Sequence, residues 1–296
     1  MDMNLFMDYL RYERNYSAHT VLAYSNDLQQ FTDFLQNLNK SFTMESADLD
    51  TVRKWIVFLM NASYSSSSIN RKISALQSYY KYLIRQGVLK KNPIRLLTGP
   101  KKSKSLPYFV KEKDMNEVLD GDENEAGEDF ETVRNMLIME MLYETGIRCS
   151  ELTGIKNADV DVEAMMLKVT GKRNKQRLIP FAGLLKEKIS QYNNVRAKTV
   201  EKKNDRFFVR KDGKPITSAI VYYLVKKKLS SIPTLSKRSP HVLRHAFATS
   251  MLNDGAEISA VRNLLGHSSL ASTSVYTHVT FEELKKVYNA HPRAKY

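Results

Sequence analysis

The sequence has a single cysteine, Cys149, in 296 residues, which excludes an internal disulfide and a metal cage built from thiolates. Long apolar runs are also missing. The run at 136–139 is far shorter than a membrane-spanning helix, and charged residues interrupt every helix-length window. The first residues lack the basic segment and apolar stretch of a secretory signal. These absences favour a cytoplasmic protein that does not enter a membrane.

Two further absences concern cofactors. The sequence has no glycine-rich loop that would cradle nucleotide phosphates, and no carboxylates grouped with metal-ligand spacing. We therefore expect neither a nucleotide cofactor nor a bound metal. The alternative is zinc held by His241, His245 and His267, since the first two have the spacing of a zinc-binding helix. It is disfavoured because no glutamate stands between them as a general base, and because Arg244 would place a positive charge beside the metal.

What the sequence has in excess is positive charge, with a net charge of +14 and an isoelectric point near 9.6. Between Lys168 and Lys228 there are 18 Lys and Arg against 4 Asp and Glu, an excess equal to that of the whole chain. Many basic stretches are simply solvated surface, but one this one-sided indicates a polyanionic partner. This one-sidedness favours nucleic acid over an acidic protein or an anionic membrane. The membrane is disfavoured further because no basic amphipathic helix with bulky apolar residues is present.

The length suits two domains, and the composition shows where they divide. Residues 1–98 predict an all-helical domain. Residues 99–107 are rich in Pro, Gly, Ser and Lys and predict an exposed linker. Residues 108–296 form the second domain, in which the short acidic stretch at 121–129 is expected to be a loop.

Helix signals recur through the first domain. We expect a short helix at 4–13, a helix capped by Ser17, another opened by Asp48, and a fourth that follows the serines at 65–68 and ends at Gly87. Tyrosines of the fourth helix are expected in the core. Its polar side carries cations that we expect to meet DNA phosphates, namely Arg71, Lys72 and Lys81.

The second domain mixes helix and strand signals. A capping box beginning at Asp114 predicts a helix start, and the apolar segment at 131–143 predicts a buried helix ended by Gly146. Alternating apolar residues on both sides of a polar turn predict a β-hairpin within 160–181. From Ser218 onward the pattern is helical again. The expected fold class is mainly α with a small antiparallel β-sheet.

Three residues of this domain are candidates for gripping a phosphate. Arg148 follows a helix-stopping glycine, and the spacing of His241 and Arg244 places them on one helix face. Guanidinium forks match the non-bridging oxygens of a phosphate and stay charged at any workable pH. As charge builds in a pentavalent transition state, two such forks can supply the electrostatic stabilisation that metal ions supply elsewhere.

Tyr276 is the best candidate for a nucleophile among 16 tyrosines. A phenol, with a pKa of about 10, needs a neighbouring base or cation to help it ionise. Tyr276 has His278 two residues after it and His267 nine residues before it. Attack would give a phosphotyrosyl ester and release a 5′-hydroxyl, and another strand can rejoin that ester without ATP. Other tyrosines lack such neighbours, among them Tyr222, Tyr223 and Tyr288.

The leaving 5′-hydroxyl needs a proton, which a lysine at the tip of the hairpin is well placed to donate. Lys172 is the first candidate, and Lys175 in the same turn is the alternative. Either lysine can instead simply contact the DNA backbone.

Five segments together carry a resemblance. The set is Gly-Ile-Arg-Cys-Ser-Glu-Leu at 146–152, Thr-Gly-Lys-Arg-Asn-Lys at 170–175, His-Val-Leu-Arg-His at 241–245, Leu-Leu-Gly-His at 264–267 and Val-Tyr-Thr-His at 275–278. Over essentially the whole chain it resembles the tyrosine recombinase (phage integrase) family. The length, the helical first domain and a His-Pro-Arg-Ala sequence near the end are similar to the Xer branch.

The resemblance implies site residues and a fold. It implies a SAM-like core-binding domain and an α+β catalytic domain that together clamp duplex DNA. Glu151 matches the acidic position that supports the first catalytic arginine, and Arg173 stands where Xer proteins usually carry glycine. The basic hairpin residues Arg173, Lys175 and Arg177 are expected to contact DNA. The implied catalytic residues are Arg148, Lys172, His241, Arg244 and His267 around the phosphate, with Tyr276 as the nucleophile.

The resemblance also implies an assembly. The partner is double-stranded DNA at a specific recombination site, bound by a tetramer that includes a second recombinase in some systems. Near the C-terminus a capping box at Thr280 predicts a helix at about 281–290. Its apolar stripe either packs on the chain's own core or, as the family implies, docks on a neighbouring protomer. The stripe consists of Phe281, Leu284, Val287 and Tyr288.

The expected function is site-specific recombination through a 3′-phosphotyrosyl intermediate and a Holliday junction. Xer-type resolution of chromosome dimers, which serves chromosome partition and cell division, is the first expectation. The alternative is a mobile-element integrase or inversion enzyme. A type IB topoisomerase would share the chemistry without a defined site, and a catalytically silent DNA-binding protein would require Tyr276 to be structural.

Overall fold

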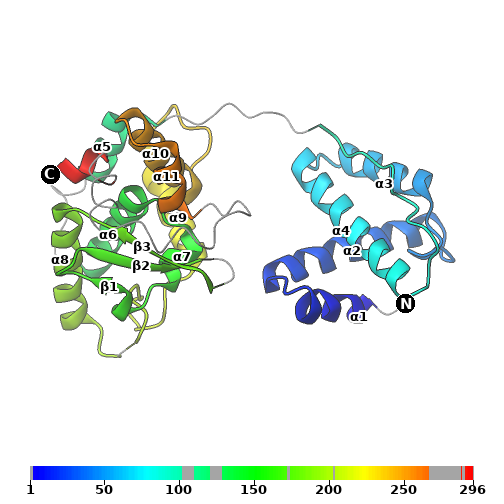
Figure 1. The fold of residues 1–296 in the computed structure, drawn as a ribbon, viewed down its shortest axis with the longest axis horizontal. Helices are drawn as coiled ribbons and strands as arrows, with labels where there is room; N and C mark the ends of the chain where they lie inside the picture. The colour runs from blue at the N-terminus through cyan, green and yellow to red at the C-terminus, as the bar shows by residue number, and fades with distance from the viewer. Residues whose placement is uncertain are drawn as a thin grey trace. The chain divides into compact units, whose positions relative to one another are not determined.

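The chain folds into two compact units, Met1–Leu106 and Pro107–Tyr296 (Figure 1). The computed structural model describes residues 3–101, 110–120, 129–171, 174–202, 204–266, 288 and 291–295. Both units are mainly helical, and the second adds a small three-stranded antiparallel sheet, so the predicted fold class is confirmed. In this part of the chain no helix combines the length and apolar character that crossing a bilayer requires.

The first unit is helical throughout its regular elements. The helix predicted at 4–13 is divided, because its second half widens into a π-helical turn. The elements are α1 (Met3–Asp8), the π-helical turn (Tyr9–Glu13), α2 (Ala18–Leu38), α3 (Leu49–Asn61) and α4 (Ser66–Arg85).

Capping side chains begin three of these helices, two of them at the residues predicted from the sequence. The side chains of Ser17, Asp48 and Ser65 accept hydrogen bonds from the backbone N–H three residues ahead, at 3.3, 2.8 and 3.2 Å. Each bond satisfies one of the N–H groups that a helix start leaves without a partner. After α4, Gly87 adopts a left-handed conformation with a φ of +73°, so the helix cannot continue past it.

The core of the first unit is rich in aromatic residues. Phe31 of α2 and Trp55 of α3 lie with ring centroids 4.7 Å apart. Tyr79 and Tyr80 of α4 are fully buried, which confirms that the tyrosine stripe is core. Leu22 of α2 is 59% exposed and does not join this core.

The second unit begins with α5 (Glu112–Asp120). The predicted start at Asp114 is wrong, because the Lys111 carbonyl already accepts a hydrogen bond from the Met115 N–H at 3.1 Å. The helix therefore starts ahead of the capping-box sequence.

The buried apolar helix predicted at 131–143 is α6 (Phe130–Thr145), the central element of this unit. Asp129 caps its start, and Gly146 ends it in the left-handed region with a φ of +58°. Helices α8 (Gly183–Thr199) and α10 (Pro240–Asn253) pack against it (Figure 1). Because neighbours surround it, α6 is buried around its circumference rather than along one stripe.

The predicted hairpin is confirmed as β2 (Met166–Thr170) and β3 (Gln176–Pro180), and β1 (Val160–Asp161) extends it to a sheet of order β1-β2-β3. The hairpin closes where the Gly171 N–H donates to the Lys175 carbonyl at 2.7 Å. Within the turn Asn174 takes a φ of +58°, a conformation that asparagine tolerates better than most residues.

Helix α8 was not predicted from the sequence, although Leu185, Ile189 and Tyr192 recur on one face at helical spacing and are fully buried. The other elements of the unit include α7 (Cys149–Gly154), α9 (Ser218–Lys228), α11 (Ile258–Leu265) and short 3-10 turns at Asn157–Asp159, Leu229–Ser231 and Pro292–Lys295.

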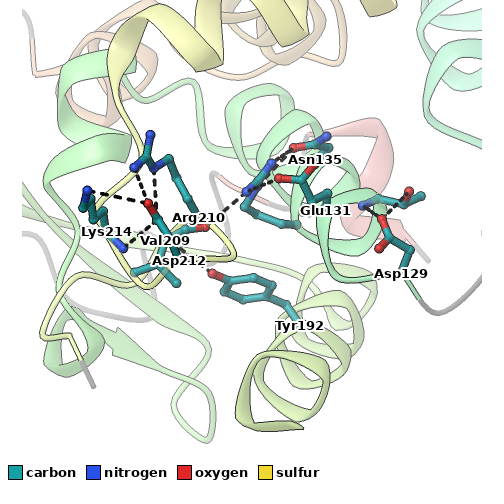
Figure 2. Close-up of polar contacts among 10 residues, drawn as sticks. Asp129, Glu131, Asn135, Tyr192, Val209, Arg210, Asp212 and Lys214 are labelled. Carbon is teal, nitrogen blue, oxygen red and sulfur yellow. Dashed lines mark hydrogen bonds and ion pairs between the residues drawn. The ribbon is translucent and has the colours of Figure 1, made fainter. Parts of the chain in front are cut away.

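Polar contacts join α6 and α8 to the loop around 207–209. The Tyr192 hydroxyl donates to the Phe207 carbonyl at 3.0 Å and accepts from the Val209 N–H at 3.3 Å. Arg134 of α6 donates to the Val209 carbonyl at 3.3 Å and to the Asn135 side chain at 2.9 Å. Figure 2 shows Tyr192 pointing from its helix toward Val209. These bonds satisfy buried groups that would otherwise destabilise the unit.

The described C-terminal residues pack on the chain's own second unit. Tyr288 is 3% exposed, and its hydroxyl donates to the Glu144 carboxylate of α6 at 2.8 Å. His291 is fully buried between the rings of Tyr143, Phe247 and Tyr288. Tyr288 of the predicted stripe therefore packs on the chain's own core. Phe281, Leu284 and Val287, of the same predicted stripe, lie outside the described residues.

An ion-pair network holds the same terminal segment. Arg293 lies 3.2 Å from the Glu140 carboxylate of α6 and donates to Asp120 at the end of α5 at 2.8 Å. Lys188 of α8 lies 3.1 Å from the other Glu140 oxygen. The terminal turn is accordingly drawn beside α5 in Figure 1.

Glu144 gives a pH-dependent stability prediction. Burial, and then the charge of Glu140, raises the pKa of Glu144 well above its ordinary value. A carboxyl with a raised folded-state pKa contributes stability below the unfolded-state pKa and loses it as the pH rises through the folded-state value. We expect Glu144→Gln to increase the melting temperature at pH 8 and to have little effect at pH 4.

The control for this prediction is Glu187→Gln, which removes the same charge at an exposed position of α8. Thermal unfolding followed by circular dichroism between pH 4 and 8 measures both variants. A Glu144→Gln difference that stays constant with pH would contradict the expectation.

Candidate active site

Arg148 is placed by the turn that joins α6 to α7. Gly146 reverses the chain, and Arg148 then precedes the first residue of α7 in an extended conformation. Glu151, at the third position of α7, accepts hydrogen bonds from the Arg148 backbone N–H and from its guanidinium, both at 2.8 Å. The carboxylate thereby fixes the backbone and the side chain of the same arginine. About a third of the Arg148 side chain remains exposed, at 35%.

A second arginine shares the same carboxylate. Arg177 of β3 donates from both terminal nitrogens to the two oxygens of Glu151, at 2.9 Å each. Burial alone would raise the pKa of Glu151, but the hydrogen bonds and charge of Arg177, followed by those of Arg148, lower it to about 2. Glu151 is therefore ionised at neutral pH and is a permanent counter-charge between two guanidinium groups.

Arg244 of α10 is held by backbone carbonyls instead of a carboxylate. Its two terminal nitrogens donate to the carbonyls of Gly146, at 2.6 Å, and Leu265, at 2.5 Å. Burial, and then the positive charge of Arg148, lowers the pKa of Arg244 to about 10. The group stays charged at pH 7. Two cationic forks close enough to repel each other, one of which has no carboxylate partner among the described residues, are suited to receive an anion.

The C-terminal end of α11 accepts hydrogen bonds from both Arg177 and Arg244. The Leu264 carbonyl accepts from the Arg177 Nε at 2.7 Å, and the Leu265 carbonyl accepts from Arg244. Both carbonyls belong to the last turn of a helix, where positive charge is favourable and intrahelical partners are lacking. Gly266, with a φ of +64°, ends the helix immediately before His267 in the sequence.

The histidines of α10 lie on its solvent side. His241 and His245 are exposed, whereas Arg244 turns into the unit. His241 and Arg244, predicted to share one helix face, therefore differ in exposure: the histidine faces solvent and the arginine three residues later is buried. Among the described residues, no three His, Cys, Asp or Glu side chains gather as metal ligands would.

The structure therefore brings together three of the predicted site residues, Arg148, Glu151 and Arg244. Four others lie outside the described residues, so their positions stay predictions: Lys172, Arg173, His267 and Tyr276. Cys149, beside the first arginine, is 8% exposed, and burial raises the pKa of its thiol.

The predicted DNA contacts divide into exposed and buried residues. Lys81, Lys175 and Arg71 are exposed, and Arg71 also donates to Asp27 at 2.6 Å. Lys72 is 2% exposed, and its ammonium lies 2.8 Å from the same carboxylate. The contact predicted for Lys72 is thus corrected, because a buried aspartate requires the lysine as its counter-charge.

Arg177 requires the same correction. The sequence predicted a DNA contact, but the residue is 9% exposed and its fork is occupied by Glu151. The signal that would have placed it inside is strand periodicity. In β3, Arg177 alternates with the exposed Leu178 and shares the inward face with Ile179.

Comparisons with known proteins match this organisation. Residues 109–283 match the phage integrase family, and residues 3–87 match the phage integrase N-terminal SAM-like domain. The chain is 38% identical to tyrosine recombinase XerC of Staphylococcus carnosus, covering 98% of this chain and 97% of the relative. Identity to tyrosine recombinase XerC of Listeria innocua is 39%, with the same two coverages of 98% and 97%.

Solved structures agree on the fold. The XerH site-specific recombinase bound to palindromic difH substrate, a post-cleavage complex, superposes with a TM-score of 0.73 at 21% identity, covering 93% of this chain and 81% of that one. The Tn1549 transposon integrase in complex with transposon right-end DNA gives a TM-score of 0.69 at 21% identity, covering 96% of both chains. The family matches and the full-length relatives lead to one conclusion: the chain belongs to the phage integrase family and is a site-specific tyrosine recombinase of the Xer type.

Proposed function

We propose that the catalytic centre of this recombinase consists of Arg148, Lys172, His241, Arg244 and His267, with Tyr276 as the nucleophile and Glu151 in support. The observation that carries the proposal is that two arginines meet at the turn after α6: Arg148 lies in this turn, and Arg244 donates to its Gly146 carbonyl. Glu151 holds Arg148 through its backbone and its side chain, and Arg244 is held by two carbonyls and by no carboxylate of the described residues. This arrangement supports binding of a phosphate that lacks a metal counter-ion.

In the proposed first step the Tyr276 hydroxyl passes its proton to a neighbouring base, for which His267 and His278 are the candidates, and its oxygen attacks the scissile phosphorus. A P–O bond to the tyrosine forms as the P–O5′ bond breaks, and Lys172 donates the proton that the leaving 5′-hydroxyl needs. Arg148 and Arg244 stabilise the charge that develops on the non-bridging oxygens. A 5′-hydroxyl from a partner strand then reverses these steps, which reseals the DNA without an external energy source.

We assign DNA binding to both domains, with residues 1–98 as the core-binding domain, 99–107 as the linker and 108–296 as the catalytic domain. The exposed cations Lys81 and Lys175 support this assignment, as does the excess of positive charge between residues 168 and 228. A protein that neutralises several phosphates releases counterions, so binding should weaken steeply with added salt.

The cellular role we propose is Xer-type resolution of chromosome dimers, by a tetramer acting at a specific site. Full-length relatives named tyrosine recombinase XerC support this role. Four identical subunits, or two subunits paired with a second recombinase, satisfy the same chemistry. A mobile-element role is the second candidate, favoured by the structural likeness to the Tn1549 transposon integrase.

The test uses a supercoiled plasmid with two directly repeated copies of a chromosome-terminus site from the source genome. We expect the purified protein, alone or with the second recombinase of that genome, to excise the intervening DNA as a circle. A plasmid without the site serves as the control and should stay supercoiled. Relaxation of both plasmids at the same rate would contradict site-specific recombination and indicate a topoisomerase.

A further inference from the structure

Arg177 occupies a position that the proposed catalytic set does not explain. It is a buried arginine on β3, and its donor groups bond two other parts of the site. Its fork holds Glu151 at 2.9 Å through both oxygens, and its Nε donates to the Leu264 carbonyl at 2.7 Å. One side chain therefore links the β-hairpin, the start of α7 and the end of α11.

Two glycines show how closely the chain is packed around this ion pair. A Cβ added to Gly171 would lie 3.2 Å from a Glu151 oxygen and 3.8 Å from an Arg177 nitrogen. A Cβ added to Gly266 would lie 3.2 Å from an Arg177 nitrogen and 3.4 Å from its central carbon. The planar ion pair thus has a glycine packed against it from the hairpin and another from the end of α11.

Each of these two glycines comes directly before a residue of the proposed catalytic set. Gly171 immediately precedes Lys172, and Gly266 immediately precedes His267. The third segment on the ion pair is that of Arg148, which Glu151 holds through the backbone and the side chain. Three members of the proposed catalytic set are therefore either bonded to the Glu151–Arg177 pair or one residue beyond a glycine that packs on it.

We propose that Arg177 is a positioning residue for the recombination reaction, holding in place Arg148, through Glu151, and the two glycines that precede Lys172 and His267 in the sequence. The proposal rests on the catalytic roles assigned above. Arg177 itself does not touch DNA, because its donors are committed inside the protein. A bidentate fork with a third donor is required, and lysine, with a single ammonium, cannot replace it.

The test compares Arg177→Met and Arg177→Lys with wild type on a nicked duplex that traps the covalent protein–DNA complex. In both variants Glu151 keeps Arg148 as a counter-charge, so we expect a folded protein. We expect the rate of trapping at saturating DNA to fall at least about 100-fold, as when one transition-state donor is lost. DNA affinity and the slope of its logarithm against the logarithm of salt concentration should stay those of wild type, since no phosphate contact is removed.

A substrate with sulfur in place of the bridging 5′-oxygen supplies a readout that a general loss of structure would not change. A thiolate leaves without a protonating acid, so a misplaced Lys172 no longer slows the step. On this substrate we expect the rate ratio between wild type and each Arg177 variant to be at least about ten-fold smaller. A mispositioned general acid accounts for a change of this size. The matched control is Arg134→Met, which removes another buried arginine with an ion pair, to Glu131, outside this cluster. It should trap DNA at the wild-type rate.

The outcomes separate this inference from the proposed function. If wild type itself forms no covalent complex, the proposed function fails. If wild type forms it and the Arg177 variants match its rate, only the positioning role is overturned. A flatter salt dependence would show that Arg177 binds DNA, and an equal defect on the sulfur substrate would show that it does not position Lys172; either result overturns the inference.

Discussion

Arg244→Lys is expected to lower the rate of covalent complex formation at saturating DNA by about 10³-fold, the loss typical of a removed transition-state donor. A guanidinium has five N–H donors. In Arg244 one donates to the Gly146 carbonyl at 2.6 Å and another to the Leu265 carbonyl at 2.5 Å. The remaining donors are those we assign to the scissile phosphate. An ammonium is a point charge and cannot bond both carbonyls while presenting a fork to the phosphate.

The control for this prediction is Arg196→Lys. Arg196 also donates to backbone carbonyls of the second unit, at Phe207, Asn204 and Arg206, but none of these belongs to the site. It should keep the wild-type cleavage rate even if its melting temperature falls. DNA affinity of Arg244→Lys, measured by filter binding, should change far less than its rate. An affinity loss as large as the rate loss would contradict a role specific to the transition state.

Gly146→Ala is expected to reduce the free energy of unfolding by about 2–5 kcal/mol, and with it the cleavage rate. Gly146 has a φ of +58°, a conformation that costs an alanine about 1–2 kcal/mol. An added Cβ would also lie 2.4 Å from a ring carbon of Phe247, and relieving such overpacking costs about 1–3 kcal/mol. The same residue supplies a carbonyl to Arg244 and lies two residues before Arg148, so the distortion reaches both guanidinium groups.

Gly255→Ala separates the two causes. Gly255 has a φ of +88°, and an added Cβ would meet nothing within 4 Å. This variant should therefore show only the backbone cost, and it should cleave DNA like wild type. Urea unfolding of the two variants measures the difference. If Gly146→Ala is no less stable than Gly255→Ala, the packing of the turn against Phe247 is not what the structure indicates.

Much of the fold could be predicted from local signals in the sequence. Ser17 and Asp48 were recognised as caps because a side-chain oxygen must satisfy the first N–H groups of a helix. Gly146 is recognisable as a helix end because helices commonly end in a left-handed backbone conformation, which favours glycine. The hairpin followed from alternation of apolar and polar residues. Each of these signals depends only on near neighbours in the chain.

What could not be predicted depends on contacts between distant segments. The DNA contact predicted for Lys72 rests on its place on the polar side of the fourth helix, and that for Arg177 on its place in the basic hairpin. Their buried partners, Asp27 and Glu151, lie 45 and 26 residues away in the sequence. The carbonyls that hold Arg244 are equally remote, since Gly146 is 98 residues before it. Residue types supplied the candidates for the site, but tertiary contacts decide which of the cations stay exposed and which are buried against a carboxylate.

The measurement that tests the central claim most directly is the identity of the residue that joins the protein to DNA. Wild-type protein and Tyr276→Phe are incubated with a nicked duplex carrying the recombination site. The trapped complex is then digested with protease, and the DNA-linked peptide is sequenced by mass spectrometry. We predict a single peptide in which Tyr276 is esterified to a 3′ phosphate, and no complex with Tyr276→Phe. Attachment through another residue, attachment to a 5′ phosphate, or an undiminished complex in the variant would contradict the account.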